Sequence, residues 1–211
     1  MTEKRLELDR ATSALLVMDF QSTVVERFAA NAAGLTSRVA SVIAAAREAD
    51  VRVLYVVVGF RPGYPEVSAR NKSFSALRQS ARFVPGSPEI EIHPDVAPRE
   101  SEVVVTKHRV SGFFGTDLDL ILRANGLETL VLTGIATSGV VLSTLRHAAD
   151  ADYACVVASD GCADADPEVH RMLLEKVFPR QAEVVTCADV VAALRCAPDR
   201  RARADSAAER R

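Results

Sequence analysis

The chain has 211 residues, of which 48% are hydrophobic and 26% are charged, and its formal net charge is −2. This length and composition predict one globular domain with a single core, and the near-neutral charge argues against nucleic acid or an anionic membrane as a partner. Neither a secretory signal nor an apolar run of roughly 18 residues, as a membrane span needs, is present. The four cysteines have no CxxC spacing, which is typical of free thiols in a reducing compartment, so we expect a cytoplasmic protein.

Short apolar segments alternate with helical patterns along the chain. Strands are predicted at residues 13–18, 51–58, 102–106, 130–132, 153–158 and 184–186. Helices are predicted at 35–50, 116–124, 139–150, 167–178 and 188–195. Residues 22–34 are ambiguous, and the proline-rich stretch from 59 to 100 is predicted to be a long excursion with a short strand at 89–93. This alternation predicts a parallel sheet with helices on both faces, an α/β fold of the three-layer, doubly wound kind. We expect one domain over residues 1–197 and a flexible arginine-rich tail at 198–211.

Three features follow predicted strands directly: Asp19, Lys107 and the small-residue turn at 135–140. In a doubly wound sheet the carboxyl ends of the strands line one crevice. A carboxylate and an ammonium that face each other there favour each other's charged forms. They would form a candidate acid or base with a cationic orienter, although each residue alone is more often a turn former or a solvated charge.

Three segments resemble the isochorismatase-like hydrolases, also called the cysteine hydrolase superfamily: LLVMDFQ, then VVVTKHRVSGFFGTDLDLILRANGLETLVLTGIATSGVVLSTLRHAADADY, then VASDGCADADPEVH. The resemblance spans about residues 13–194, and its specific part is the block strand-TGxATS-helix-TxRxAxxxxY. It implies six mainly parallel strands flanked by helices, and assembly as a homo-oligomer, a dimer or larger. Cysteine members use an Asp, a Lys and a Cys. Asp19 and Lys107 match the first two, and the position of the Cys is Val140.

The resemblance also implies a cis peptide bond between Ile135 and Ala136, with the amides of residues 136 and 140 directed into an oxyanion hole. A valine cannot form a thioester, so covalent amide hydrolysis is not expected. The loop GFRPGYPE lacks the histidines of the nicotinamidase metal site, so no catalytic metal and no other cofactor are expected. True isochorismatases carry a glycine near this position and cleave a vinyl ether after an Asp protonates the substrate's carbon. Gly139 and Val140 would be a variant of that arrangement.

The first hypothesis is therefore a hydrolase of a small, anionic molecule, cleaving a vinyl ether or a C–N bond, in which Asp19 is the general acid and Lys107 orients it. The alternative is a catalytically inactive family member that serves as a small-molecule-binding or regulatory protein. A third hypothesis is a covalent hydrolase with a displaced nucleophile, Ser138 or Cys162. Against it, a serine at a helix start is more often a cap, and a cysteine is more often a small buried side chain.

Further residues are expected to bind substrate. Arg61 is suited to hold a carboxylate through two parallel hydrogen bonds, and Gln21, two residues after Asp19, would point the same way. Aromatic side chains in two loops would form walls, although core residues beneath loops would look the same. These loop residues, together with the polar groups near Lys107 and the turn, are Phe60, Tyr64, Phe74, Phe113, Phe114, His108, Thr137 and Ser138.

Overall fold

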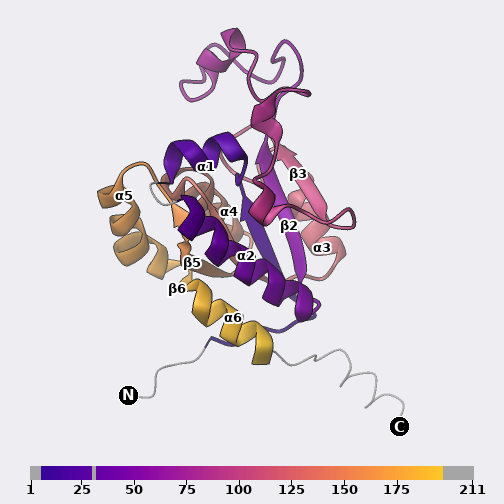
Figure 1. Cartoon of the computed structure of the whole chain (residues 1–211), viewed down its shortest axis with the longest axis vertical. Helices are drawn as coiled ribbons and strands as arrows, with labels where there is room; N and C mark the ends of the chain where they lie inside the picture. Colours follow the sequence, from indigo (N-terminus) through magenta and orange to yellow (C-terminus); the bar gives the residue numbers. More distant parts are fainter. Residues whose placement is uncertain (1–5, 30–31, 197–211) are drawn as a thin grey trace.

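A six-stranded sheet forms the centre of the computed structural model, which describes residues 6–29 and 32–196 (Figure 1). The strands are β1 (Ser13–Met18), β2 (Arg52–Val58), β3 (Val103–Lys107), β4 (Thr129–Ile135), β5 (Ala154–Ala163) and β6 (Glu183–Val185). Their order is β3-β2-β1-β4-β5-β6, and every neighbouring pair is parallel. All six residues of β1 are buried, because a central parallel strand is covered on both faces. The predicted α/β fold is confirmed.

Helices cover both faces of the sheet and make it the middle of three layers. The first face carries α1 (Ser22–Phe28), α2 (Ala32–Glu48) and α6 (Cys187–Cys196), whose apolar residues pack on Val17 and Tyr55 (Figure 1). The second face carries α3 (Leu118–Ala124) and α4 (Leu142–Asp150), which pack on Leu16 and Val56, and near them lie α5 (Pro167–Met172) and the π-helical turn η5 (Leu173–Val177). Alternate strand residues thus serve opposite apolar layers.

Three local expectations need correction. The ambiguous stretch after β1 contains α1. The strand expected at 89–93 is wrong: the short 3-10 helix η2 (Pro88–Ile90) lies there, and Ile92 forms only an isolated bridge with Gln21. Prolines remove backbone donors, which disfavours a regular strand. Strand β5 runs on to Ala163, five residues beyond its expected end, because Cys162 and Ala163 pair with the end of β4 after a register shift. The expected tail at 198–211 lies outside the described residues.

The excursion between β2 and β3 projects beyond the sheet (Figure 1). It contains the 3-10 helices η1 (Ser75–Gln79), η2 and η3 (Pro94–Val96), and a small core of its own around Phe60 and Tyr64. A further 3-10 helix, η6 (Phe178–Arg180), precedes β6. Among the described residues no helix has both the length and the apolar character that a bilayer crossing requires.

The strand order positions the site. Starting from β1 the chain builds the sheet outward through β2 to β3, and starting from β4 it builds the other half through β5 to β6. The carboxyl ends of β1 and β4 therefore flank the point where the winding reverses, which is where open α/β sheets bind their ligands. Asp19 follows β1 directly, and the turn after Ile135 follows β4.

Candidate active site

Asp19 and Lys107 form a buried ion pair at the carboxyl end of the sheet. Asp19 Oδ2 lies 2.8 Å from Lys107 Nζ, and the two side chains are 9% and 3% exposed, respectively. Asp19 has a left-handed backbone with φ +56°, uncommon for a residue other than glycine. Its N–H donates to Val56 O at 2.7 Å. Lys107 is the last residue of β3 and is paired in register with Val58. The ends of β1 and β3, which flank β2 in the sheet, thus bring the carboxylate and the ammonium together.

The carboxyl group of Asp19 is held between two opposing effects. Burial raises its pKa, and the charge and hydrogen bond of Lys107 oppose that rise, with a net upward shift. The second oxygen, Oδ1, is buried and receives no hydrogen bond from the described residues. Burying an acceptor without a partner is costly. Oδ1 is therefore the atom of the pair that is available to a water molecule or a substrate.

Lys107 is fixed by a second contact, because its Nζ also donates to Arg109 O at 3.1 Å. The same segment then reaches the turn after β4. A Cβ placed on Gly139 would lie 3.9 Å from Val110 Cγ1. The chain from Lys107 to Val110 thus connects the ion pair with the turn, and the three features expected to share a crevice are close together.

The turn after β4 begins with a cis peptide bond between Ile135 and Ala136, as expected. The helix predicted from residue 139 instead starts as a π-helical turn, η4 (Thr137–Val141), and becomes α4 at Leu142. Ala136 O accepts hydrogen bonds from Gly139 N at 3.0 Å and from Val141 N at 3.3 Å. Val140 is 2% exposed and belongs to the apolar layer that faces α3 and α4.

Two residues near α5 hold the turn, and sequence reasoning missed both. Ser138 N–H donates to Asp164 Oδ2 at 2.7 Å, and the buried Thr137 Oγ1 lies 2.8 Å from His170 Nδ1. Burial lowers the pKa of His170, which favours a neutral imidazole at neutral pH. The expected side-chain cap by Ser138 is therefore replaced by a carboxylate that accepts from its backbone amide. Asp166, two residues after Asp164, caps α5 through the N–H groups of residues 168 and 169.

The side chain of Gln21 is engaged in hydrogen bonds with backbone groups. It is fully buried, its Nε2 donates to Val58 O at 3.0 Å and Glu89 O at 2.7 Å, and its Oε1 accepts from Val58 N at 2.9 Å. The amide thus joins the end of β2 to the excursion. The structure gives Gln21 a structural role in place of the expected substrate contact.

Several other expected substrate contacts are also engaged elsewhere. Arg61 pairs with the carboxylate of Glu66 through Nη1. Phe60 packs on Tyr64 and Phe74, with ring centroids 5.7 and 5.5 Å away, in the core of the excursion. His108 is tied to that core, since its Nδ1 lies 2.6 Å from Gly59 O and its ring packs on Phe60.

The two phenylalanines after Lys107 have opposite surroundings. Phe113 is buried and stacks on His147 with ring centroids 4.5 Å apart, beneath α4, so it is a core residue. Phe114 is 64% exposed. Neither residue is placed at the ion pair by a contact within the described chain.

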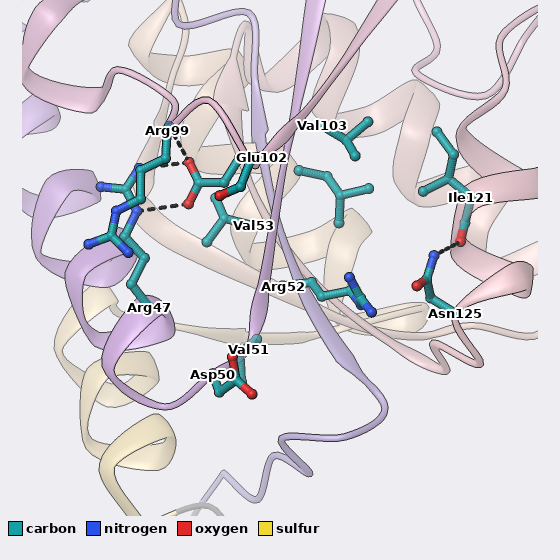
Figure 2. A pocket seen from close by; sticks show the side chains of 12 residues that line it. Arg47, Asp50, Val51, Arg52, Val53, Arg99, Glu102, Val103, Ile121 and Asn125 are labelled. Carbon is teal, nitrogen blue, oxygen red and sulfur yellow. Dashed lines mark hydrogen bonds and ion pairs between the residues drawn. The ribbon is translucent and has the colours of Figure 1, made fainter.

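A hollow of about 700 Å³ lies over the carboxyl end of β2 and β3. Its lining includes the expected contacts Phe60, Arg61 and His108 but neither Asp19 nor Lys107. A smaller pocket of about 200 Å³ lies at the opposite, amino end of these strands (Figure 2). There Arg47 forms two hydrogen bonds of 2.8 Å to the Glu102 carboxylate, one to each oxygen (Figure 2). The pairing of Arg47 with Glu102 joins α2 to the segment before β3. This second pocket is remote from the ion pair.

Two further expectations concern the Cys162 thiol and a metal site. Burial raises the pKa of the Cys162 thiol to about 12, so Cys162 stays protonated at neutral pH, and this contradicts its role as a displaced nucleophile. Within residues 6–29 and 32–196, no group of three or more histidines, cysteines and carboxylates is placed to hold a metal ion.

Comparison with known proteins identifies the relatives of this chain. Residues 13–189 match the isochorismatase domain model. A ureidoacrylate amidohydrolase, RutB of Methylobacterium radiotolerans, is 32% identical over 82% of this chain and 75% of its own length. The uncharacterized isochorismatase family protein YecD of Escherichia coli O157:H7 is 32% identical over 90% of this chain and 100% of its own. A solved isochorismatase family protein from Burkholderia thailandensis superimposes with a TM-score of 0.77 at 30% identity, over 91% of this chain and 100% of that one.

Proposed function

Because the chain belongs to the isochorismatase family of hydrolases, we propose that it hydrolyses a small anionic molecule by acid–base chemistry at Asp19 and Lys107, without a covalent intermediate. The observation that carries this proposal is the buried ion pair beside the reversal point of the sheet, with Asp19 Oδ1 free of hydrogen bonds from the described residues. A relative named as an amidohydrolase favours a C–N bond as the target.

The chemistry needs one oxygen that can take and return a proton. In C–N cleavage, Oδ1 of Asp19 accepts a proton from water while the water oxygen bonds to the carbonyl carbon. The proton is then donated to the leaving nitrogen as the C–N bond breaks. Lys107 fixes the carboxyl group and balances its charge. The raised pKa of Asp19, caused by burial, brings the group closer to the pH at which proton transfer in both directions is efficient.

The identity of residue 140 supports a mechanism without an enzyme nucleophile. We propose that Val140 occupies the position of the cysteine in cysteine members, and its side chain is apolar and buried. Cys162 is a protonated buried thiol, and the Asp164 carboxylate at the exposed Ser138 accepts from its backbone N–H and not from its hydroxyl. Water is then the attacking group, and the backbone amides of residues 136 and 140 would bind the oxyanion.

A substrate screen with matched variants tests the proposal. Ureido acids, simple amides and vinyl ethers are incubated with wild type, Asp19→Asn and the control Asp150→Asn, which makes the same chemical change on the exposed end of α4. We expect turnover per folded molecule to fall by about 10²–10⁴-fold in Asp19→Asn and to persist in the control. Turnover that survives Asp19→Asn would sink the proposed role of Asp19. Anion binding without turnover of any substrate would instead favour the alternative, a binding or regulatory protein.

A second experiment separates direct hydrolysis from covalent catalysis. Val140→Cys restores a thiol at the proposed position. On incubation with ureido compounds, mass spectrometry should find a substrate-derived adduct on this variant and none on wild type. An adduct on wild type, at Ser138 or elsewhere, would show that the enzyme has a nucleophile and would contradict the mechanism proposed above.

A further inference from the structure

Arg109 is a cation beside the ion pair that no carboxylate balances within the described part of the chain. Its Nη1 donates to His108 O at 2.6 Å and its Nη2 to Glu66 O at 2.8 Å. Both acceptors are backbone carbonyls, and no described carboxylate lies within ion-pair distance of the guanidinium. The side chain is half-buried, so it is held in one orientation although its charge remains uncompensated.

The neighbouring cations do have partners. Lys107 pairs with Asp19, and Arg61 pairs with Glu66. Burial opposes the ionisation of Glu66, but hydrogen bonds from the backbone and from Arg61 hold its pKa below the usual value, so it is a carboxylate at neutral pH. These two pairs are each neutral overall. Of these three cations, Arg109 is therefore the one without a paired carboxylate in the described part of the chain.

Arg109 also lies at the right place along the chain. Its carbonyl accepts from Lys107 Nζ, and the next residue, Val110, is the one that approaches Gly139. The backbone of Arg109 thus contacts the ammonium of the ion pair, and the next residue lies beside the turn after β4, while the guanidinium is held by the carbonyls of residues 108 and 66. A guanidinium fork matches the geometry of a carboxylate, and a partly buried position strengthens the attraction.

We infer that Arg109 binds the anionic group of the substrate. This group is a single carboxylate, and it lies near enough to the cleaved bond for Arg109 to hold it while Asp19 reaches that bond. This inference rests on the proposed function and replaces Arg61, which pairs with Glu66 through Nη1, as the anion-binding residue. The two carbonyl contacts orient the guanidinium before substrate arrives, which lowers the cost of binding.

The test measures binding, so that it does not depend on turnover. Acetate, N-carbamoylglycine and 3-ureidopropionate, each with its primary amide as a neutral match, are titrated by calorimetry into the Asp19→Asn protein. The same titrations are made after adding Arg109→Met, Arg109→Lys, or the control Arg78→Met, which removes an exposed arginine of the excursion between β2 and β3. A hydrogen bond to a charged group is worth about 1.5–3 kcal/mol, which corresponds to about 10- to 150-fold in affinity.

We expect at least one carboxylate to bind 10-fold or more tightly than its amide, and Arg109→Met to remove that preference while amide affinity stays within 3-fold. Arg78→Met should retain the preference, and Arg109→Lys should retain only part of it. No carboxylate preference in any pair, or equal losses for acid and amide in Arg109→Met, would overturn the inference and leave Arg109 a structural tie. Turnover that persists in Asp19→Asn would overturn only the proposed role of Asp19, so the two failures are distinguishable.

Discussion

Replacing Lys107 by methionine should make folding depend strongly on pH through one carboxyl group. The two side chains have similar length, so the substitution removes the ammonium while it preserves most of the packing. Asp19 would then be a buried carboxylate without its cationic partner. An isolated charge in that environment avoids the cost of desolvation by taking up a proton, so its pKa, already raised by burial, rises further.

The free-energy cost can be bounded. At pH 7, a carboxyl group with an ordinary pKa of 3.8 that must be protonated in the folded state costs at most about 4 kcal/mol, since each pH unit is worth about 1.4 kcal/mol. This agrees with the roughly 3–5 kcal/mol lost when one partner of a buried ion pair is removed. Because the pKa is raised in the folded state, the protonated group favours folding at low pH, and this contribution is lost as pH rises through the folded pKa. The deficit should therefore shrink to about 1.6 kcal/mol at pH 5.

Urea unfolding of wild type and Lys107→Met at pH 5, 6 and 7 measures the difference directly. The double variant Asp19→Asn/Lys107→Met removes the charge as well, so its stability should change much less between pH 5 and 7 than that of Lys107→Met. A gap between Lys107→Met and wild type that is constant across this range would refute the reasoning, because the lost stability would then not come from the charge on Asp19.

Three further outcomes follow from contacts outside the ion pair, each measured by urea unfolding. Gln21→Ala should cost about 2–4 kcal/mol, because it leaves buried backbone groups at the end of β2 without partners; a loss below 1 kcal/mol would mean that water replaces the amide. Asp164→Ala should cost about 0.5–2 kcal/mol, as loss of a helix cap does, with a matching exposed control in Asp150→Ala, and equal losses in both would deny the role of the Ser138 contact. Glu102→Gln, which weakens the pairing with Arg47, should lower stability by about 1–3 kcal/mol yet leave turnover unchanged, unless the pocket in Figure 2 communicates with the site.

The fold could be read from local pattern because burial and sequence agree strand by strand. The segment SALLVM is apolar after its first residue and becomes a strand buried on both faces. The later half of β5 could not be read in this way. Its residues include Ser159, Asp160 and Gly161, which favour turns. They lie at a register shift, and the strand resumes its pairing with the end of β4 at Cys162 and Ala163.

Asp19 and Lys107 were predictable as a pair because each follows an apolar strand, and parallel strands end at the same edge. The error over Gln21 has a definite cause. The expectation that residues two apart point the same way holds only for extended backbone, and Asp19 has a left-handed backbone instead. The engagement of Arg61 with Glu66, and of Ser138 with Asp164 across 26 positions of sequence, depends on loop conformations that carry no periodic pattern.

The turn after β4 limits which mechanisms this site can support. A covalent hydrolase needs a nucleophile at the helix start, and the buried Val140 supplies only apolar volume there. Water must then attack, and water attack requires a base with an oxygen that the protein has not already engaged. Asp19 Oδ1 meets that requirement, whereas its Oδ2 is held by Lys107. Since Asp19 and Lys107 neutralise each other, the ion pair has little net charge with which to hold an anion. We therefore propose that different groups serve substrate charge and bond cleavage, Arg109 for the first and Asp19 for the second.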